Sequence, residues 1–388
     1  MIKRCRLGVL LLLLAVVLFS LPVSAASLPI KAKSAILMEA QTGEILYEHN
    51  PDEKLPIASV TKIMTMALAL EALRDEKVTM DDVIVGSYLA KSMGGTQIWL
   101  EEGEQMSFRD MLYAVAVGSA NDCAVAIAEY LGGSLESFAA IMNERAAELG
   151  MTNTNYVNPT GLDAPEHYST ARDVAILSRY ALTLPQFTTL TSTWEYWVRK
   201  GTPQEVWLTT FNKLIKQYPG CDGLKTGYTS KAGYCLSATA QRDGLRLIAV
   251  VLGADTAQNR TNSIKALLDY GFQMYKSEKL ISKGEPLGDV QVLHGVADKV
   301  ELSAGEDLIF PVKRGQSLEL TREIQVPEYA EAPISQGDYL GDIVFKDPAG
   351  NVVAKTQIVA QSSVERAGFV KIVGQTMRQM LKALFFRN

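Results

Sequence analysis

Three short motifs in this chain carry groups that could together attack an amide carbonyl. In chain order they are Ser59-Val60-Thr61-Lys62, Ser119-Ala120-Asn121 and Lys225-Thr226-Gly227. A serine hydroxyl becomes an effective nucleophile when an adjacent base takes its proton. A lysine amine can be that base once its pKa is lowered by burial or by a nearby cation. The motifs therefore predict acyl transfer through a covalent serine intermediate.

A helix must bring Ser59 and Lys62 together. The apolar run over residues 57–72, rich in Ala, Leu and Met, predicts such a helix with Ser59 in its first turn. Side chains three residues apart share one face of a helix, so the hydroxyl and the amine can meet. Lys225 could be the cation that lowers the pKa of Lys62. Taken alone, this spacing is also typical of an ordinary helix start.

The second motif lies between Val117-Gly118 and a predicted helix over residues 121–131. In the catalytic interpretation the Ser119 hydroxyl relays a proton between Lys62 and the leaving amine. The Asn121 amide would then hold Lys62 and contact the substrate backbone. The alternative is that Ser119 or Asn121 simply caps the following helix, which both residue types do well.

The third motif falls in a predicted strand over residues 222–229. Lys225 and Thr226 could bind a carboxylate, and Gly227 would let a substrate backbone approach the strand closely. Strand alternation predicts that Lys225 and Gly227 share one face while Thr226 lies on the other. A lone Lys-Thr-Gly is usually just a strand end, but the three motifs in this order favour a shared site.

The elements around the motifs predict an α/β fold of the α+β kind, with a mostly antiparallel sheet flanked by helices over residues 26–275. A hairpin is expected over residues 34–47, and three consecutive strands are expected over residues 222–252. The remaining expected helices cover residues 108–117, 135–149, 170–182 and 257–275.

Two further regions follow. Residues 276–362 contain short alternating apolar runs separated by turns, which predict a small all-β domain. Residues 363–388 carry apolar side chains at three- and four-residue intervals, with five basic residues and one acidic residue among them. This pattern predicts an amphipathic helix suited to an anionic membrane surface. The alternative is a helix that docks on its own protein or on a second copy.

The first 25 residues have the three parts of a secretory signal. Basic residues near the start precede an apolar run over residues 7–19, and small residues end at Ala25. The run is too short to cross a bilayer comfortably, since about 20 residues are needed. We therefore expect export to the outer face of the cytoplasmic membrane, with cleavage after Ala25.

Composition excludes some functions. The whole chain has a formal charge of −5, and the predicted signal contains basic residues but no acidic ones, so the remainder is more acidic still. Such a chain is poorly suited to nucleic-acid binding. Cys123, Cys221 and Cys235 remain after the signal, an odd number without a Cys-x-x-Cys pair, and the three histidines are far apart. We therefore expect no disulfide framework and no metal site.

The three motifs lie within longer strings that resemble a known family. The strings are Ala58-Ser59-Val60-Thr61-Lys62-Ile63-Met64-Thr65, Gly118-Ser119-Ala120-Asn121-Asp122, Asn158-Pro159-Thr160-Gly161-Leu162 and Asp222-Gly223-Leu224-Lys225-Thr226-Gly227-Tyr228-Thr229. In these strings, and in the order of signal, catalytic region, β region and tail, the sequence resembles the low-molecular-mass penicillin-binding proteins of the D-alanyl-D-alanine carboxypeptidase family. The likeness covers nearly the whole chain.

The resemblance implies a role for each candidate residue. Ser59 would be acylated by the penultimate D-Ala carbonyl of a peptidoglycan stem peptide, with Lys62 as general base and Ser119 as proton relay. The implied substrate-binding residues are Asn121, Lys225, Thr226, Gly227, Tyr228 and Arg260. The backbone N–H groups of Ser59 and Tyr228 would form the oxyanion hole. β-Lactam antibiotics would acylate Ser59 and then stall, and no cofactor is implied.

Two other functions fit part of the sequence. A serine β-lactamase shares the acylation step but needs a carboxylate to activate the deacylating water, which Asp163 or Glu166 could supply. A catalytically silent scaffold would bind peptidoglycan through the same residues but would not cleave it. A third possibility keeps the acyl-enzyme and replaces water by an amine acceptor, as a transpeptidase would.

Overall fold

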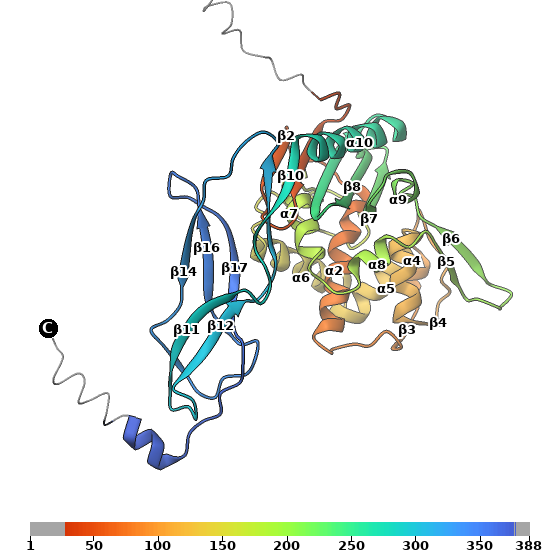
Figure 1. Ribbon diagram of the computed structural model, residues 1–388. Coiled ribbons are helices and arrows are strands. Elements are labelled where there is room, and N and C mark those ends of the chain that lie inside the picture. Colours follow the sequence, from red (N-terminus) through yellow and green to blue (C-terminus); the bar gives the residue numbers. More distant parts are fainter. Residues whose placement is uncertain (1–27, 376, 378–388) are drawn as a thin grey trace, which may run out of the picture.

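The computed structural model describes residues 28–375 and residue 377. Figure 1 shows a larger body of helices and strands joined to an elongated β region, with the hairpin β5–β6 at the far end of the larger body. The elements of the larger body up to residue 191 are β1 (Ser34–Glu39), β2 (Ile45–His49), the 3-10 turn η1 (Ala58–Thr61), α2 (Lys62–Arg74), β3 (Val83–Val85), α3 (Tyr88–Lys91), β4 (Gln105–Ser107), α4 (Phe108–Val117), α5 (Asn121–Gly132), α6 (Leu135–Glu148), α7 (Ala171–Ala181) and α8 (Phe187–Thr191). Its later elements are β5 (Glu195–Val198), β6 (Val206–Thr209), α9 (Leu214–Gln217), β7 (Cys221–Thr229), β8 (Gly233–Arg242), β9 (Leu245–Ala254) and α10 (Ala257–Met274).

A five-stranded antiparallel sheet forms the frame of the larger body, in the order β2-β1-β9-β8-β7. Successive side chains of a strand point to opposite faces of a sheet. In β1, Ile36 and Met38 accordingly join the large core that contains α2, α4 and α5, whereas Ala35 and Leu37 join a second core with α10. The sheet is thus covered on both faces.

Strand β7 lies at the edge of this sheet, next to the turn η1. This edge is where the first and third motifs meet, although they are far apart in the chain. The expected α+β architecture with helices on an antiparallel sheet is confirmed.

The C-terminal region is built from strands. They are β10 (Tyr275–Ile281), β11 (Pro286–Leu293), β12 (Lys299–Ala304), β13 (Leu308–Lys313), β14 (Thr321–Gln325), β15 (Tyr329–Glu331), β16 (Tyr339–Lys346) and β17 (Val352–Ala360). Six of them form a sheet in the order β14-β16-β17-β12-β11-β15, and β10 pairs with β13. One separate apolar core, which includes Ile343 and Ile358, holds the region together. The expected all-β C-terminal region is confirmed.

The structure differs from the sequence expectations in several places. Ser59 lies in a 3-10 turn rather than in the first turn of α2, because Ala58 has a φ of 48° and the regular helix starts only at Lys62. The sequence pattern also missed the hairpin β5–β6 and the short elements β3, α3 and β4.

The predicted tail helix lies largely outside the described residues, as does the predicted signal. Residues 369–375 are helical, and the side chains of Phe369, Val370 and Met377 are exposed. Within residues 28–375 and 377, no single helix is long and apolar enough to cross a membrane, while α5 and α6 meet that test only as a pair bent by 82°.

Candidate active site

The Ser59 turn rests on a loop that follows α6. Gly161 in this loop has a φ of +82°, and a Cβ placed there would lie 1.9 Å from the Ala58 carbonyl oxygen. The loop itself is closed by Asn158, whose Oδ1 accepts hydrogen bonds from the backbone N–H of Thr160 at 3.1 Å and of Gly161 at 2.7 Å. Only a glycine fits this contact, so the loop sets the position of the nucleophile turn.

Lys62 is completely buried and points at Ser59. Its Nζ donates to Ser59 Oγ at 2.9 Å, to Asn121 Oδ1 at 2.6 Å and to the Thr160 carbonyl oxygen at 2.6 Å. Burial, and then the charge of Lys225, hold the pKa of Lys62 well below its usual range, although the Asp122 carboxylate acts in the opposite direction. A neutral amine in this position can accept the Ser59 proton.

Ser119 and Asn121 enter the site from the junction of α4 and α5. Ser119 has a φ of +59°, which turns the chain sharply between the two helices, and its side chain is buried at the cavity. Neither residue caps α5: the N-cap position is Ala120, and it makes no side-chain cap bond. Asn121 instead fixes Lys62, so the structure favours the catalytic interpretation of this motif over capping.

Gly227 lets β7 pack against the nucleophile turn. A Cβ on Gly227 would lie 2.7 Å from the Ile57 carbonyl oxygen and 2.9 Å from the backbone nitrogen of Ser59. The glycine is therefore required by the protein's own backbone, whereas the sequence suggested a substrate approach. This packing brings the chain that leads to Tyr228 beside the Ser59 N–H.

Two cationic side chains, those of Lys225 on β7 and Arg260 on α10, lie at the site. Lys225 is buried, and burial together with the Arg260 charge lowers the pKa of Lys225 to about 7. Arg260, near the start of α10, has a buried Nε without a hydrogen-bond partner. Neither residue takes part in an ion pair among the described residues. A buried donor without a partner is costly, so this pair suits an incoming carboxylate.

A cavity of about 750 Å³ joins these groups. Its lining includes Ser59, Ser119, Asn121, Thr226, Gly227, Tyr228 and Arg260. Thr226 and Gly227 both line it, and Gly227 does so with its backbone because it has no side chain. Lys62 and Lys225 lie directly behind the lining, and each is buried. The three motifs and Arg260 thus share one site.

One wall of the cavity is a loop over residues 94–101, named here the wall loop. Asn121 binds it twice, since its N–H donates to the Thr96 carbonyl oxygen at 2.7 Å and its Nδ2 donates to the Gly94 carbonyl oxygen at 2.6 Å. Asp122 Oδ2 accepts from the backbone N–H of Ile98 at 2.9 Å and of Leu100 at 3.0 Å. The start of α5 therefore holds this loop in place.

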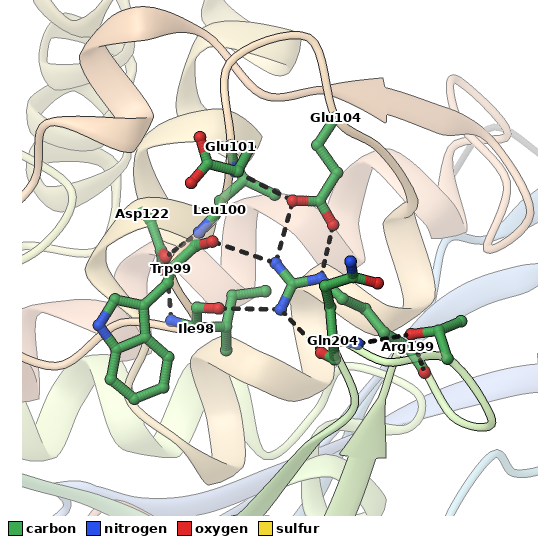
Figure 2. Close-up of polar contacts among 9 residues, drawn as sticks. Ile98, Trp99, Leu100, Glu101, Glu104, Asp122, Arg199 and Gln204 are labelled. Atoms are coloured by element: carbon green, nitrogen blue, oxygen red, sulfur yellow. Dashed lines mark hydrogen bonds and ion pairs between the residues drawn. The ribbon is translucent and has the colours of Figure 1, made fainter.

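Arg199, after β5, holds the same loop from outside, as Figure 2 shows. Its guanidinium pairs with the Glu104 carboxylate at 2.5 and 3.0 Å and donates to the Ile98 carbonyl oxygen at 2.9 Å. The side chains of both partners are mostly buried. A bidentate pair of this kind adds geometric definition as well as energy. Neither residue was singled out in the sequence, because no local motif links them.

His167 hydrogen-bonds to Thr61, the last residue of the 3-10 turn that contains Ser59. Its Nδ1 accepts from the Val157 N–H at 3.1 Å, so Nε2 carries the proton and donates to Thr61 Oγ1 at 2.9 Å. Burial lowers the pKa of His167 to about 4, so the ring is neutral at pH 7. A lone histidine in a loop gave no sequence signal for this role.

The described residues contain no cluster of His, Cys, Asp or Glu side chains arranged to hold a metal ion. Cys123, Cys221 and Cys235 are buried free thiols.

Comparison with known proteins places this site in a family. A family model described as D-alanyl-D-alanine carboxypeptidase matches residues 22–256, and one described as penicillin-binding protein 5, C-terminal domain, matches residues 275–366. The D-alanyl-D-alanine carboxypeptidase DacF of Bacillus subtilis is 41% identical over 353 residues, which cover 91% of this chain and 90% of that protein.

Solved structures of penicillin-binding proteins are also similar to this chain. Penicillin binding protein 5 from Haemophilus influenzae matches with a TM-score of 0.69 and 30% identity, over 87% of this chain and 98% of that one. Penicillin-binding protein D2 from Listeria monocytogenes in its ampicillin-bound form matches with a TM-score of 0.57 and 34% identity, over 63% of this chain and 98% of that one. The chain therefore belongs to the D-alanyl-D-alanine carboxypeptidase family of penicillin-binding serine hydrolases.

Proposed function

We propose that this enzyme removes the terminal D-Ala from peptidoglycan stem pentapeptides through an acyl-enzyme on Ser59. The observation that carries the proposal is the 2.9 Å hydrogen bond between Lys62 Nζ and Ser59 Oγ at a fully buried amine. Burial favours the neutral amine, which is the form that can act as a base.

In the acylation step, Lys62 takes the Ser59 proton as Oγ attacks the carbonyl carbon of the penultimate D-Ala. The C–N bond to the terminal D-Ala then breaks, and the proton returns to the leaving amine through Lys62 and Ser119. Asn121 keeps the Lys62 amine directed at Ser59, because its Oδ1 accepts from Nζ at 2.6 Å.

The developing oxyanion is held by the backbone N–H groups of Ser59 and Tyr228. Support comes from Gly227, whose absent side chain leaves room for β7 beside the Ser59 nitrogen. Donors aimed at a developing charge typically contribute about 3 kcal/mol each.

The substrate's terminal carboxylate binds Lys225 and Arg260, with Thr226 beside them in the cavity. This accounts for the buried Lys225 and for the buried, unpartnered Nε of Arg260, which no carboxylate of the described chain neutralises. It also accounts for cleavage at the end of the peptide, since the terminal carboxylate lies one residue beyond the scissile amide bond.

Water then attacks the acyl carbonyl and releases the shortened peptide. A β-lactam carbonyl follows the same first step, and its ring-opened acyl group stays on Ser59. The β-lactamase alternative loses support because the matching family model and the B. subtilis relative are D-alanyl-D-alanine carboxypeptidases. A catalytically silent scaffold is disfavoured because the buried Lys62 amine contacts the Ser59 hydroxyl at 2.9 Å.

The test is D-Ala release from a peptide ending in D-Ala-D-Ala, with a Ser59→Ala variant beside the unaltered enzyme. We expect release that disappears in the variant. Release that persists in Ser59→Ala would place the nucleophile elsewhere, and release from neither protein would contradict the proposed activity.

We also propose export and attachment to the outer face of the cytoplasmic membrane through residues 363–388, with domain boundaries near residues 25, 275 and 362. Exposed Phe369, Val370 and Met377 at the start of that segment support the attachment. Deleting residues 363–388 should release the protein from anionic vesicles while leaving D-Ala release unchanged. Equal vesicle binding by the shortened protein would rule the segment out as the anchor.

A further inference from the structure

The four tryptophans of this chain lie in two segments that Arg199 joins, and none of the four lines the cavity. Trp99 belongs to the wall loop, while Trp194, Trp197 and Trp207 lie in or beside the hairpin β5–β6. Tryptophan is highly buried on average, yet Trp99 is 65% exposed, Trp197 42% and Trp207 55%. Several exposed rings in one place are typical of a binding surface.

The hairpin has one face for packing and one face left free. Tyr196 on the packed face stacks on Tyr113 at 4.3 Å, and its hydroxyl donates to the Asp110 carboxylate at 2.7 Å. Trp197 pairs directly with Trp207 across the two strands, and their rings stack with centroids 5.9 Å apart at 22°. Since Tyr196 already anchors the hairpin to α4, the exposed Trp197–Trp207 pair is not needed to hold it there.

The hairpin is connected rigidly to the reacting groups. Leu208 on β6 occupies the space that a side chain at Gly118 would take, immediately before Ser119. Two residues beyond β6, Phe211 lines the cavity, and Asn212 Nδ2 then donates to the Gly223 carbonyl oxygen of β7 at 2.8 Å. At the tip, Arg199 binds the wall loop (Figure 2). The hairpin is therefore fixed in position relative to Ser59, and its strand β6 leads directly to the cavity lining at Phe211.

We propose that the Trp197–Trp207 pair is a platform for the glycan strand to which the stem peptide is attached. The inference rests on the proposed function, because a stem peptide whose D-Ala end is in the cavity carries its sugar-linked end outward past the rim. The C–H faces of pyranose rings are apolar and stack on indole rings, and the paired indoles supply a broad surface for this contact.

A membrane is the other chemistry that exposed tryptophans can meet. Figure 1 places the hairpin at the opposite end of the molecule from residues 369–375, the start of the proposed membrane segment. A binding surface at the end of the molecule away from the proposed membrane segment is suited to the glycan of the cell wall.

The test compares two substrates with the same pentapeptide, one free in solution and one attached to polymeric glycan. For a Trp197→Ala/Trp207→Ala double variant we expect kcat/KM to fall about tenfold on the glycan-linked substrate and to stay within twofold on the free peptide. Trp197→Tyr/Trp207→Tyr keeps aromatic faces and should recover most of the loss. Tyr339→Ala, an equally exposed aromatic residue of the C-terminal sheet, is the matched control and should change neither rate.

Binding to peptide-free glycan strands, measured in the Ser59→Ala background, tests the platform independently of catalysis. We expect binding that the double tryptophan variant loses. Equal losses of activity on both substrates, unchanged activity on both, or glycan binding that survives the double substitution would each overturn the proposal. So would a loss of vesicle binding without a loss of glycan binding. Failure of the proposed carboxypeptidase activity would appear separately, as no D-Ala release by the unaltered enzyme.

Discussion

The catalytic and C-terminal regions bury very different side chains. Between residues 28 and 274 the buried set includes Lys62, Lys225 and Asp122, each within or directly behind the site. In the described part of the chain after residue 275, the buried polar side chains are Ser303 and Thr356, and neither is charged. Burying a charge is costly unless it is paired or used. The contrast teaches that the first region buries charged groups, some at its site and others, such as Glu39, Glu71 and Asp173, in structural contacts, whereas the second is organised for packing.

The largest effect should come from removing the buried base. Lys62→Met keeps the length of the side chain but cannot accept the Ser59 proton, so we expect kcat/KM for D-Ala release to fall by about 10³-fold or more. A penicillin acylation rate measured on the same variant should fall in parallel. A variant that retained both rates would show that Lys62 is not the base, and a circular dichroism spectrum would confirm that it folds.

A smaller effect is expected from Lys225→Ala, which removes half of the carboxylate site. We expect KM to rise on the order of a hundredfold for peptides ending in a free carboxylate, with a much smaller change for the same peptide as its C-terminal amide. If the melting temperature collapsed instead, Lys225 would be a structural residue.

The pH dependence of KM tests Lys225 in the unaltered enzyme. Because the pKa of Lys225 in the empty site is lowered to about 7, the residue is charged below that pH and neutral above it. KM for a carboxylate substrate should therefore be constant below pH 7 and rise as the pH increases beyond it. The kcat should rise with pH as Lys62 becomes neutral. A KM that fell above pH 7 would contradict the assignment.

Arg199→Ala should have a moderate effect that reaches the site through the wall loop. Losing the Glu104 pair and the bond to the Ile98 carbonyl should loosen the loop that Asn121 binds, and we expect kcat/KM to fall about tenfold. Arg199→Lys should recover only part of the loss, since an ammonium cannot form the bidentate pair. Arg172→Ala, which removes an exposed pair with Asp52, is the matched control. Equal rates in all three proteins would show that Arg199 does not position the loop.

The smallest effect on activity is expected from a substitution in the apolar core of the C-terminal region. Ile358→Ala removes a completely buried side chain, which typically costs 2–5 kcal/mol of the free energy of unfolding. We expect a lower melting transition for the C-terminal region with unchanged D-Ala release from a soluble peptide. A matching fall in activity would mean that the two regions are energetically coupled at the site.

The sequence predicted those parts of the site that local spacing determines. Ser59 and Lys62 are three residues apart, and a 3-10 turn, like an α-helix, brings residues at this spacing close together. The Lys62 contacts with Asn121 and with the Thr160 carbonyl span 59 and 98 residues, so no periodicity could place them. Chemistry suggested the first of these partners, and nothing suggested the second.

In the fold, too, some features follow from local sequence and others do not. Strands β7, β8 and β9 were expected because three strand-like runs are separated by turn sequences at residues 229–232 and 241–244. The hairpin β5–β6 was missed because its free face exposes Trp197 and Trp207 beside charged and polar residues, which removes the usual alternation of apolar and polar side chains. Sequence patterns report burial, and surfaces that are exposed for binding escape them.

The most direct test of the central claim is the site of acylation by a labelled penicillin. Intact mass should show one adduct per chain, and peptide mapping should place it on Ser59. Acylation should fall sharply in Lys62→Met and be absent in Ser59→Ala. An adduct on Ser119 or another residue, or full-rate acylation without Lys62, would contradict the proposal that a buried neutral lysine activates Ser59.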